Sequence, residues 1–386
     1  MTTPEKTTAN NSGVTKSVSG GSRDQFWNPR FWDGVTISAW HKMLASARYR
    51  VAPTRLPMFC VISALTLLNS SLAALQRLFY GRRIAQTKLV APPIFIIGHW
   101  RSGTTLLHEY MIRDERFAFS NTYECFAPTH FLVSASMIMP WLKHLMPKKR
   151  PMDNMAAGLE RPQEDEFAIC VLGVNSPYRQ VAFPNSGLID EQYLTLRDVD
   201  DSARKRWLDA LEYILKALTV AHNKRIVLKS PPHTARVRAI LSRFPDAKFI
   251  HISRDPYTLF PSTLNLWKKL AATHGLQPPK DSPERTEKVL HDFELMYDAF
   301  FQDRDIIPEG ALCEISYDQL VAEPVKTLEK IYRELELDGF QANREAFEAF
   351  AATQKNYRKN KFELSEEMKR QIRRRWSAYF EHYVQE

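Results

Sequence analysis

Short apolar runs alternate along the chain with longer segments in which apolar residues recur every three or four positions. Runs of this length, bounded by turn-forming residues, are typical of buried β-strands, and they lie at 93–98, 225–229, 248–254 and 311–317. Helical periodicity occupies Asp201–His222, Tyr257–Leu270, Glu284–Asp303, Pro324–Leu335 and Ser365–Tyr383. The alternation predicts an α/β fold in three layers, with a parallel sheet flanked by helices.

The first 90 residues are predicted to form a polar tail followed by a helical extension. Residues 1–25 are rich in Thr, Ser, Asn and Gly, which is typical of disorder. In the extension, residues 26–90, the stretch Leu56–Gln76 contains no charged side chain and is flanked by basic residues on both sides. Three interpretations stay open for it: an accessory helix of a soluble protein, a helix lying on an anionic membrane surface, or a membrane span.

The net charge of +9 indicates an anionic partner. The sequence contains no zinc-finger, RNP or helix-turn-helix pattern, so we do not expect nucleic acid binding. The four cysteines are far apart, which favours free thiols in a reducing compartment. The N-terminus lacks the apolar core of a secretory signal. We therefore expect a cytoplasmic protein, with residues 26–90 as the candidate segment for peripheral membrane contact; the sequence does not indicate an oligomeric state.

The segment Ile94–Leu107 has the pattern of a strand, a tight loop and the start of a helix. From Gly98 to Gly103 its spacing fits the phosphate-binding loop G-x-x-x-x-G-K-[ST], except that Thr104 replaces the lysine. Because that lysine normally reaches the β- and γ-phosphates, we expect a nucleotide with one phosphate-like group in this loop. Arg101 supplies a cation from a different direction.

The same loop offers backbone donors to an anion. N–H groups at the start of a helix point towards the positive end of its dipole and bind phosphate readily. The predicted phosphate-binding residues of the loop are Arg101, Ser102, Gly103, Thr104, Thr105 and Leu106.

A second basic position follows the strand at 248–254. That strand ends at Arg254, and Ser262 comes eight residues later, after a helix-starting Asp-Pro pair. Ligands of open α/β sheets bind beyond the carboxyl ends of the strands. Arg254 and Ser262 are therefore predicted to hold a second phosphate in the same pocket.

Together these segments resemble the 3′-phosphoadenosine 5′-phosphosulfate (PAPS)-dependent sulfotransferases, in particular the bacterial-type group with an R-S-G-T-T loop. Three further segments resemble the same group, over roughly residues 90–385 in all: Arg161–Phe167, Leu228–His233 and Ile315–Val321. The resemblance implies a P-loop-like fold over residues 91–386, with an apolar insertion at about 126–190 over the acceptor pocket. It also implies that the loop binds the 5′-phosphosulfate and that Arg254 and Ser262 bind the 3′-phosphate.

The implied reaction moves a sulfuryl group from PAPS to a hydroxyl or amine of a carbohydrate, lipid or other small acceptor, and leaves 3′,5′-bisphosphoadenosine. Two alternatives are a degenerate P-loop nucleotide kinase or NTPase and a non-catalytic nucleotide-binding protein. A kinase needs an acidic metal ligand after a later strand, whereas those strands end in Lys229 and Arg254. No metal-ligand spacing is present, so no metal is expected.

The catalytic groups would relieve charge on the leaving phosphate and accept the proton of the acceptor. Arg101 is predicted to neutralise the charge on the leaving phosphate. For the base, the resemblance suggests Glu124, because several sulfotransferases carry a catalytic glutamate about that far past the loop. Glu164 and Glu166, on either side of Asp165, are equally open.

Further basic residues are candidates for contact with the acceptor or the donor. His233 ends the Lys229–His233 segment and could orient an acceptor, and Lys229 could contact the donor nucleotide or its sulfonate. In relatives a basic segment near the C-terminus closes over the 3′-phosphate, for which Lys359 is the candidate here, with Lys355, Arg358 and Lys361 beside it.

Overall fold

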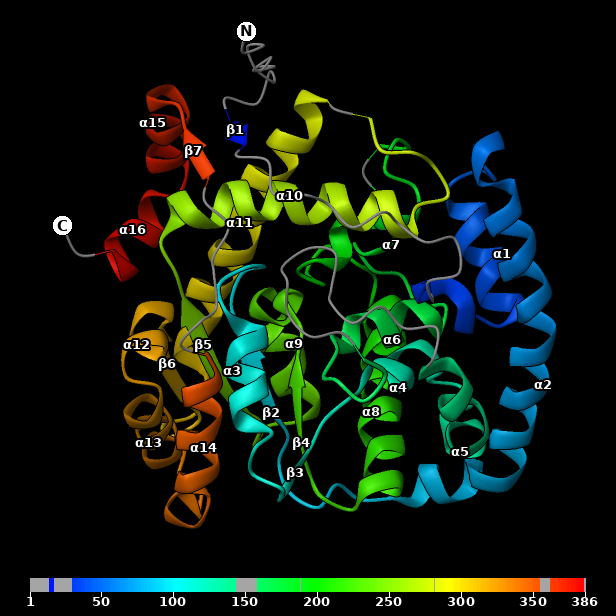
Figure 1. The fold of residues 1–386 in the computed structure, drawn as a ribbon, viewed down its shortest axis with the longest axis horizontal. Coiled ribbons are helices and arrows are strands. Elements are labelled where there is room, and N and C mark those ends of the chain that lie inside the picture. Colours follow the sequence, from blue (N-terminus) through cyan, green and yellow to red (C-terminus); the bar gives the residue numbers. More distant parts are fainter. Residues whose placement is uncertain are drawn as a thin grey trace, which may run out of the picture.

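Five parallel strands form the central sheet of the computed structural model, in the order β3-β4-β2-β5-β6 (Figure 1). The structure describes residues 14–16, 30–143, 158–187, 189–280, 282–354 and 362–384. The strands are β2 (Ile94–Ile97), β3 (Phe117–Ala118), β4 (Arg225–Lys229), β5 (Lys248–Ser253) and β6 (Leu312–Ser316). The four expected strands and their parallel pairing are confirmed, whereas the two-residue β3 is too short to leave a pattern in the sequence.

Alternate residues of β2 belong to two different cores, which makes the fold a three-layer one. Phe95 and Ile97 join the larger core, together with residues of α8, α9, α10 and α11. Ile94 and Ile96 join the smaller core, with residues of α3, α12, α13 and α14. Because successive side chains of a strand point to opposite faces, helices cover both sides of the sheet, as expected.

The helices around the sheet agree with the periodicity except near the C-terminus. The predicted helix Asp201–His222 is α8 without change of bounds, and its apolar face is buried. The expected single helix Ser365–Tyr383 is two, broken at Trp376, whose ring stacks on Phe293 at 3.7 Å. The helices are α3 (Thr104–Met111), α9 (Val237–Arg243), α10 (Pro256–His274), α11 (Pro283–Asp303), α12 (Tyr317–Ala322), α13 (Pro324–Glu334), α14 (Phe340–Gln354), α15 (Glu366–Arg375) and α16 (Ser377–Tyr383).

The described part of the expected insertion, about 126–190, contains three helices, and short 3-10 helices connect the larger elements. The three are α5 (Phe131–Leu142), α6 (Asp165–Val171) and α7 (Arg179–Ala182), and α4 (Thr122–Phe126) ends where the insertion begins. The short 3-10 helices are η1 (Phe31–Gly34), η2 (Pro53–Arg55), η4 (Glu191–Tyr193), η5 (Pro231–Arg236) and η6 (Arg304–Ile306).

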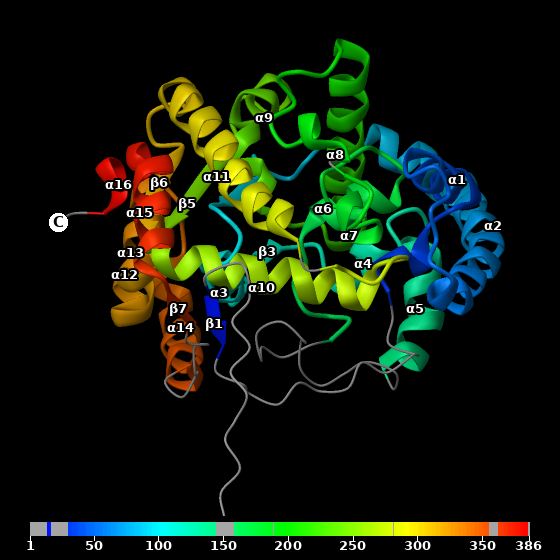
Figure 2. The same cartoon turned by 90° about the horizontal axis from the view of Figure 1, so that it is seen from above.

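The N-terminal extension is helical, as expected, and it shares the main core. It consists of η1, α1 (Ile37–Ser46) and the long helix α2 (Leu56–Gln86). Trp32, Trp40 and Ile62 are buried in the larger core, and both views place α1 and α2 on the opposite side of the molecule from α12–α14 (Figures 1 and 2). Of the tail expected to be disordered, residues Val14–Lys16 form β1, which pairs with β7 (Phe362–Leu364), and the rest lies outside the described residues.

Helix α2 buries polar side chains and exposes apolar ones. Thr66, Asn69 and Gln76 lie on its buried face, whereas Leu67 and Leu78 are exposed. It is the one helix of the described residues that is long and apolar enough to cross a membrane, and 28% of its most apolar window is buried. Because its buried face contacts α1, α5, α8 and η1, the helix lies along the protein body.

Candidate active site

The loop after β2 depends on two glycines with left-handed backbone angles. Gly98 has φ +137°, and a Cβ there would lie 2.5 Å from the carbonyl oxygen of Ile252. Gly103 has φ +108°, and a Cβ there would lie 2.4 Å from the ring of Tyr317. A larger residue would therefore clash and be strained at either position. The turn is also held by the Gly98 N–H, which donates to Thr234 Oγ1 at 2.7 Å.

The structure brings the two predicted phosphate-binding motifs into direct contact at the carboxyl edge of the sheet. Arg101 Nε donates to Ser262 Oγ at 2.9 Å. Arg254 Nη1 donates to the carbonyl oxygen of Arg101 at 2.7 Å, and its guanidinium lies 4.1 Å from the ring centre of Tyr317. Side chains from the loop, from the residue after β5 and from helix α10 thus lie together.

The start of α3 supplies the backbone donors of the loop. Gly103 is the N-cap residue and Thr104 the first residue of the helix, so the first-turn N–H groups have no acceptor within the helix. Thr105 and Leu106 follow in the same turn and are partly exposed. Ser102 differs from our expectation for its amide, because its N–H already donates to the His99 carbonyl at 3.1 Å. Its buried hydroxyl has no hydrogen-bond partner among the described residues.

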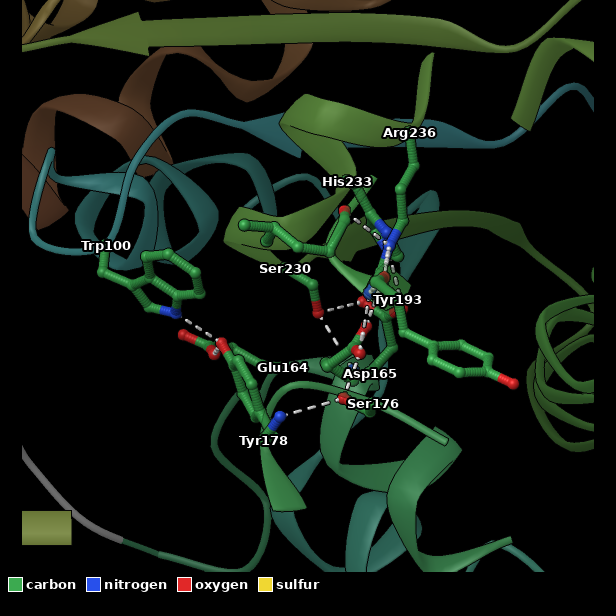
Figure 3. A network of polar contacts seen from close by, with 11 residues as sticks. Trp100, Glu164, Asp165, Ser176, Tyr178, Tyr193, Ser230, His233 and Arg236 are labelled. Atoms are coloured by element: carbon green, nitrogen blue, oxygen red, sulfur yellow. Dashed lines mark hydrogen bonds and ion pairs between the residues drawn. The ribbon is translucent and has the colours of Figure 1, made fainter. Parts of the chain in front are cut away.

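Glu164 lies close to this loop and is linked to it through two aromatic side chains. Lys229 Nζ, at the end of β4, is 2.7 Å from Glu164 Oε1, and the Tyr178 hydroxyl donates to Glu164 Oε2. The Trp100 indole N–H, next to Arg101 in the sequence, donates to the Tyr178 oxygen at 2.7 Å (Figure 3). Burial and the neighbouring Glu164 charge raise the pKa of Tyr178 well above its usual value, so Tyr178 stays protonated and donates.

Asp165, the next residue, points to a different set of partners. Its carboxylate accepts from Ser230 Oγ at 2.8 Å and lies 2.7 Å from His233 Nε2 (Figure 3). Burial alone would raise the pKa of Asp165, but the His233 charge and the hydrogen bonds from His233 and Ser230 outweigh it, so the pKa is lowered. His233 is fully buried, so the geometry gives it contact with Asp165 rather than with a bound acceptor.

Glu166 forms a buried ion pair on the far side of this segment. Arg236 Nη1 is 2.5 Å from Glu166 Oε2, and the Ser176 hydroxyl donates to Glu166 Oε1. Arg236 also donates to the carbonyl oxygen of Tyr193, and both charged side chains are fully buried. Both oxygens of Glu166 are therefore occupied by structural contacts.

Glu124 has hydrogen-bond partners of its own. It is the third residue of α4, where it forms a capping box with Asn121: the Asn121 N–H donates to Glu124 Oε2 at 2.9 Å. Its other oxygen lies 2.7 Å from His222 Nε2, at the end of α8. Neither contact involves the phosphate loop.

Sequence reasoning missed the aromatic partners of the site. Trp100 lies inside the loop motif itself, so its position could have marked it. Tyr178 gave no comparable signal, because its link to Glu164 arises only from the fold, and Tyr317, within the segment Ile315–Val321, was given no role in the site. The basic segment with Lys355, Arg358, Lys359 and Lys361 lies outside the described residues. Within the described ranges there is no group of three or more His, Cys, Asp or Glu residues that could hold a metal ion.

Comparison with known proteins agrees with this geometry. Residues 92–342 match the sequence model of the sulfotransferase family. Two proteins from Mycobacterium bovis and Mycobacterium tuberculosis, both named omega-hydroxy-beta-dihydromenaquinone-9 sulfotransferase Stf3, are 36% identical to the chain over 369 residues, which is 95% of this chain and 94% of each relative.

Solved structures show the same fold. The crystal structure of sulfotransferase STF9 from Mycobacterium avium has a TM-score of 0.68 at 18% identity and covers 91% of this chain and 93% of its own. That of sulfotransferase STF1 from Mycobacterium tuberculosis has a TM-score of 0.63 at 15% identity, with 92% and 94% covered. From the match over residues 92–342 and the 36% identity of the two relatives, the chain belongs to the sulfotransferase family.

Proposed function

We propose that this sulfotransferase uses PAPS as donor and transfers its sulfuryl group to a hydroxyl of a lipid. One observation carries the choice of donor: Arg254 contacts Arg101, and Arg101 contacts Ser262, at 2.7 and 2.9 Å. Two phosphate-binding groups in contact suit a carrier whose 5′ and 3′ ends are both anionic. The loop without a lysine disfavours a triphosphate.

Each residue of the site would then have a separate role in the reaction. Arg101 neutralises the charge that develops on the 5′-phosphate as the bond between its oxygen and sulfur breaks, because arginine stays charged at all relevant pH values. The acceptor oxygen forms the new bond to sulfur while a carboxylate takes the acceptor proton. Lys229 orients that carboxylate through the 2.7 Å ion pair.

Among the three candidate glutamates, Glu164 suits the role of base best. It is joined to the loop through Tyr178 and Trp100 and is partly exposed, whereas Glu166 is fully buried against Arg236. Glu124 caps α4 and pairs with His222. We propose that His233 and Asp165 act as positioning residues, which hold the start of α6 against η5.

The acceptor class follows from the relatives and from one cavity. The relatives at 36% identity carry the name of a hydroxylated menaquinone, and the coverage of 95% of this chain includes the whole described site. A cavity of 430 Å³, lined mainly by apolar side chains, lies between α2, α4 and α5. We propose a hydroxylated menaquinone-type lipid as acceptor, rather than a carbohydrate. The absence of disulfides among the four cysteines suits a cytoplasmic enzyme.

Thermal denaturation in the presence of nucleotides tests the donor. We expect 3′,5′-bisphosphoadenosine without magnesium to raise the melting temperature far more than Mg-ATP does, because a ligand stabilises the state that binds it. Arg254→Ala should remove most of this shift, whereas Arg374→Ala, on the exposed side of α15, should leave it unchanged. Equal or greater stabilisation by Mg-ATP would overturn the donor assignment.

Product analysis tests the acceptor. The enzyme with PAPS would be given a hydroxylated menaquinone, the same lipid without the hydroxyl, and a sugar, and sulfated products would be detected by mass spectrometry. Sulfation of the hydroxylated lipid alone supports the proposal. Sulfation of the sugar alone would contradict the lipid assignment while leaving the donor intact.

A further inference from the structure

The exposed faces of α2 and α5 form one apolar surface, here called the α2–α5 face. On α2 it includes Leu67, Leu78 and Phe79, which are 64%, 74% and 68% exposed. Met137 and Trp141 of α5 are 61% and 78% exposed, and both views show α5 next to α2 (Figures 1 and 2). Large exposed apolar patches mark sites of contact with proteins or membranes.

Polar contacts fix the orientation of α2, so its leucines cannot turn inward. Asn69 Nδ2 donates to the carbonyl oxygens of Asp33 and Val35 at 2.7 and 3.0 Å. Gln76 Oε1 accepts from the Leu132 N–H at 2.8 Å, which ties α2 to α5. A helix that left the body to span a bilayer would lose these bonds inside hydrocarbon, where each unsatisfied group is costly.

The positive charge of the whole chain is concentrated around this face. Residues 34–100 contain eight lysines and arginines and no aspartate or glutamate, while the chain as a whole has a net charge of +9. The rest of the sequence therefore carries nearly equal numbers of both signs. Basic residues are exposed near both ends of α2: Lys42, Arg48 and Arg50 near its start, and Arg82, Arg83 and Lys88 near its end. Such flanks favour an anionic lipid surface over a neutral apolar partner.

The cavity of 430 Å³ opens on the same face. Val61 and Leu68 line it and are about half exposed, at 49% and 51%. Its inner wall includes Phe126, from which a row of ring contacts leads inward: Phe126 to Phe31 at 5.1 Å, Phe31 to Phe167 at 3.7 Å, and Phe167 to Tyr178 at 4.9 Å. Tyr178 is the side chain that donates to Glu164. A row of packed aromatic rings thus lies between the cavity and Tyr178, the neighbour of the candidate base.

We propose that the α2–α5 face binds an anionic lipid bilayer, with α2 parallel to the surface, and that the cavity takes the apolar tail of the acceptor directly from that bilayer. The helix would lie in the interface with its leucines among the acyl chains and its arginines at the headgroups. Vesicle binding does not depend on the proposed sulfotransfer, whereas tail binding rests on it.

Vesicle sedimentation with the full chain tests whether the α2–α5 face binds an anionic bilayer. We expect binding to vesicles of phosphatidylcholine with phosphatidylglycerol, weaker binding to phosphatidylcholine alone, and loss of the difference at high salt. The double variant Leu67→Glu/Leu78→Glu should lower the partition coefficient by roughly tenfold or more, because two exposed leucines no longer enter hydrocarbon. Val321→Glu, at an exposed apolar position of α12, is the matched control and should bind as the wild type does.

Two matched double variants test how much the basic residues near α2 contribute to vesicle binding. Arg82→Ala/Arg83→Ala should weaken binding to anionic vesicles by roughly tenfold or more, at about a fewfold for each basic residue near the surface, whereas Arg370→Ala/Arg374→Ala on α15 should not. Equal binding of all variants would overturn the proposal. So would a stable dimer in the absence of lipid that Leu67→Glu/Leu78→Glu dissociates, because a second copy would then cover the face.

A substitution in the cavity lining tests whether the cavity binds the apolar tail of the acceptor. Val61→Trp should raise the KM for a long-tailed acceptor in vesicles and leave the KM for a short, soluble hydroxyl acceptor unchanged. Val321→Trp, at an exposed apolar position of α12 outside both the cavity lining and the α2–α5 face, is the control. If the enzyme sulfates neither acceptor, the proposed function fails while the vesicle result stands. If Val61→Trp leaves the long-tailed acceptor unaffected in an active enzyme, tail binding in the cavity is wrong.

Discussion

The edge of the sheet and the α2–α5 face place their side chains in opposite ways. At the edge, Lys229, Asp165 and Glu166 are buried, and each contacts a partner of opposite charge or a hydrogen-bonding group. On α2 the polar Asn69 and Gln76 are buried, and the large apolar residues are exposed. The buried polar side chains named here have partners in both regions, as the cost of burying them requires. What differs is the surface left to the outside: polar where a nucleotide is expected, apolar where a lipid is.

The largest expected effect concerns the edge of the sheet. Glu164→Gln should lower kcat by roughly 10²- to 10⁴-fold, since an amide cannot take the acceptor proton, while the thermal shift with 3′,5′-bisphosphoadenosine stays the same. Glu124→Gln, measured in the same assay, should keep most of its turnover. If Glu124→Gln loses turnover and Glu164→Gln does not, the base is Glu124.

A smaller effect is expected for the stability of the same segment. Glu166→Gln leaves Arg236 buried without its charge partner and should lower the free energy of unfolding by about 3–5 kcal/mol, measured by urea denaturation. Glu160→Gln breaks an exposed pair with Lys143 and should cost at most about 1 kcal/mol. Similar losses in both variants would mean that burial of the Glu166 pair is not what stabilises this edge.

The smallest effect distinguishes the two faces of α2. Asn69→Leu leaves the buried carbonyls of Asp33 and Val35 without their donor and should cost about 1–3 kcal/mol. Leu67→Asn, two positions away on the exposed face, should change stability by less than about 0.5 kcal/mol. Chemical denaturation of both variants without lipid gives the comparison. The reverse order of the two losses would contradict the orientation of α2.

Much of the fold could be predicted because local patterns determine it. The four longer strands are short, mainly apolar runs, and α8 follows its periodicity from end to end. The break at Trp376 could not be predicted, because it depends on the stacking of that ring on Phe293, 83 positions earlier in the chain. β3 is defined only by its pairing with β4.

The position of a site residue could be predicted where a local motif determines the backbone conformation around it. The predicted phosphate loop sets where Arg101 lies, and the carboxyl edge of a parallel sheet brings Arg254 and Ser262 to it. Sequence spacing could not rank the glutamates, because the three successive acids of 164–166 point to three different partners, Lys229, His233 and Arg236. The outward leucines of α2 were equally hidden, because composition does not reveal which face of a helix the body covers.

The hydrogen bond from Arg254 to the Arg101 carbonyl has a consequence for the thermodynamics of donor binding. Arg101 has a left-handed φ of +72°, and the guanidinium of Arg254 holds that peptide through a hydrogen bond of 2.7 Å from the protein itself. A loop that is shaped in advance loses little conformational entropy when its ligand arrives. Severing this bond should therefore make nucleotide association entropically costlier in calorimetry, even where the enthalpy of the phosphate contacts is retained.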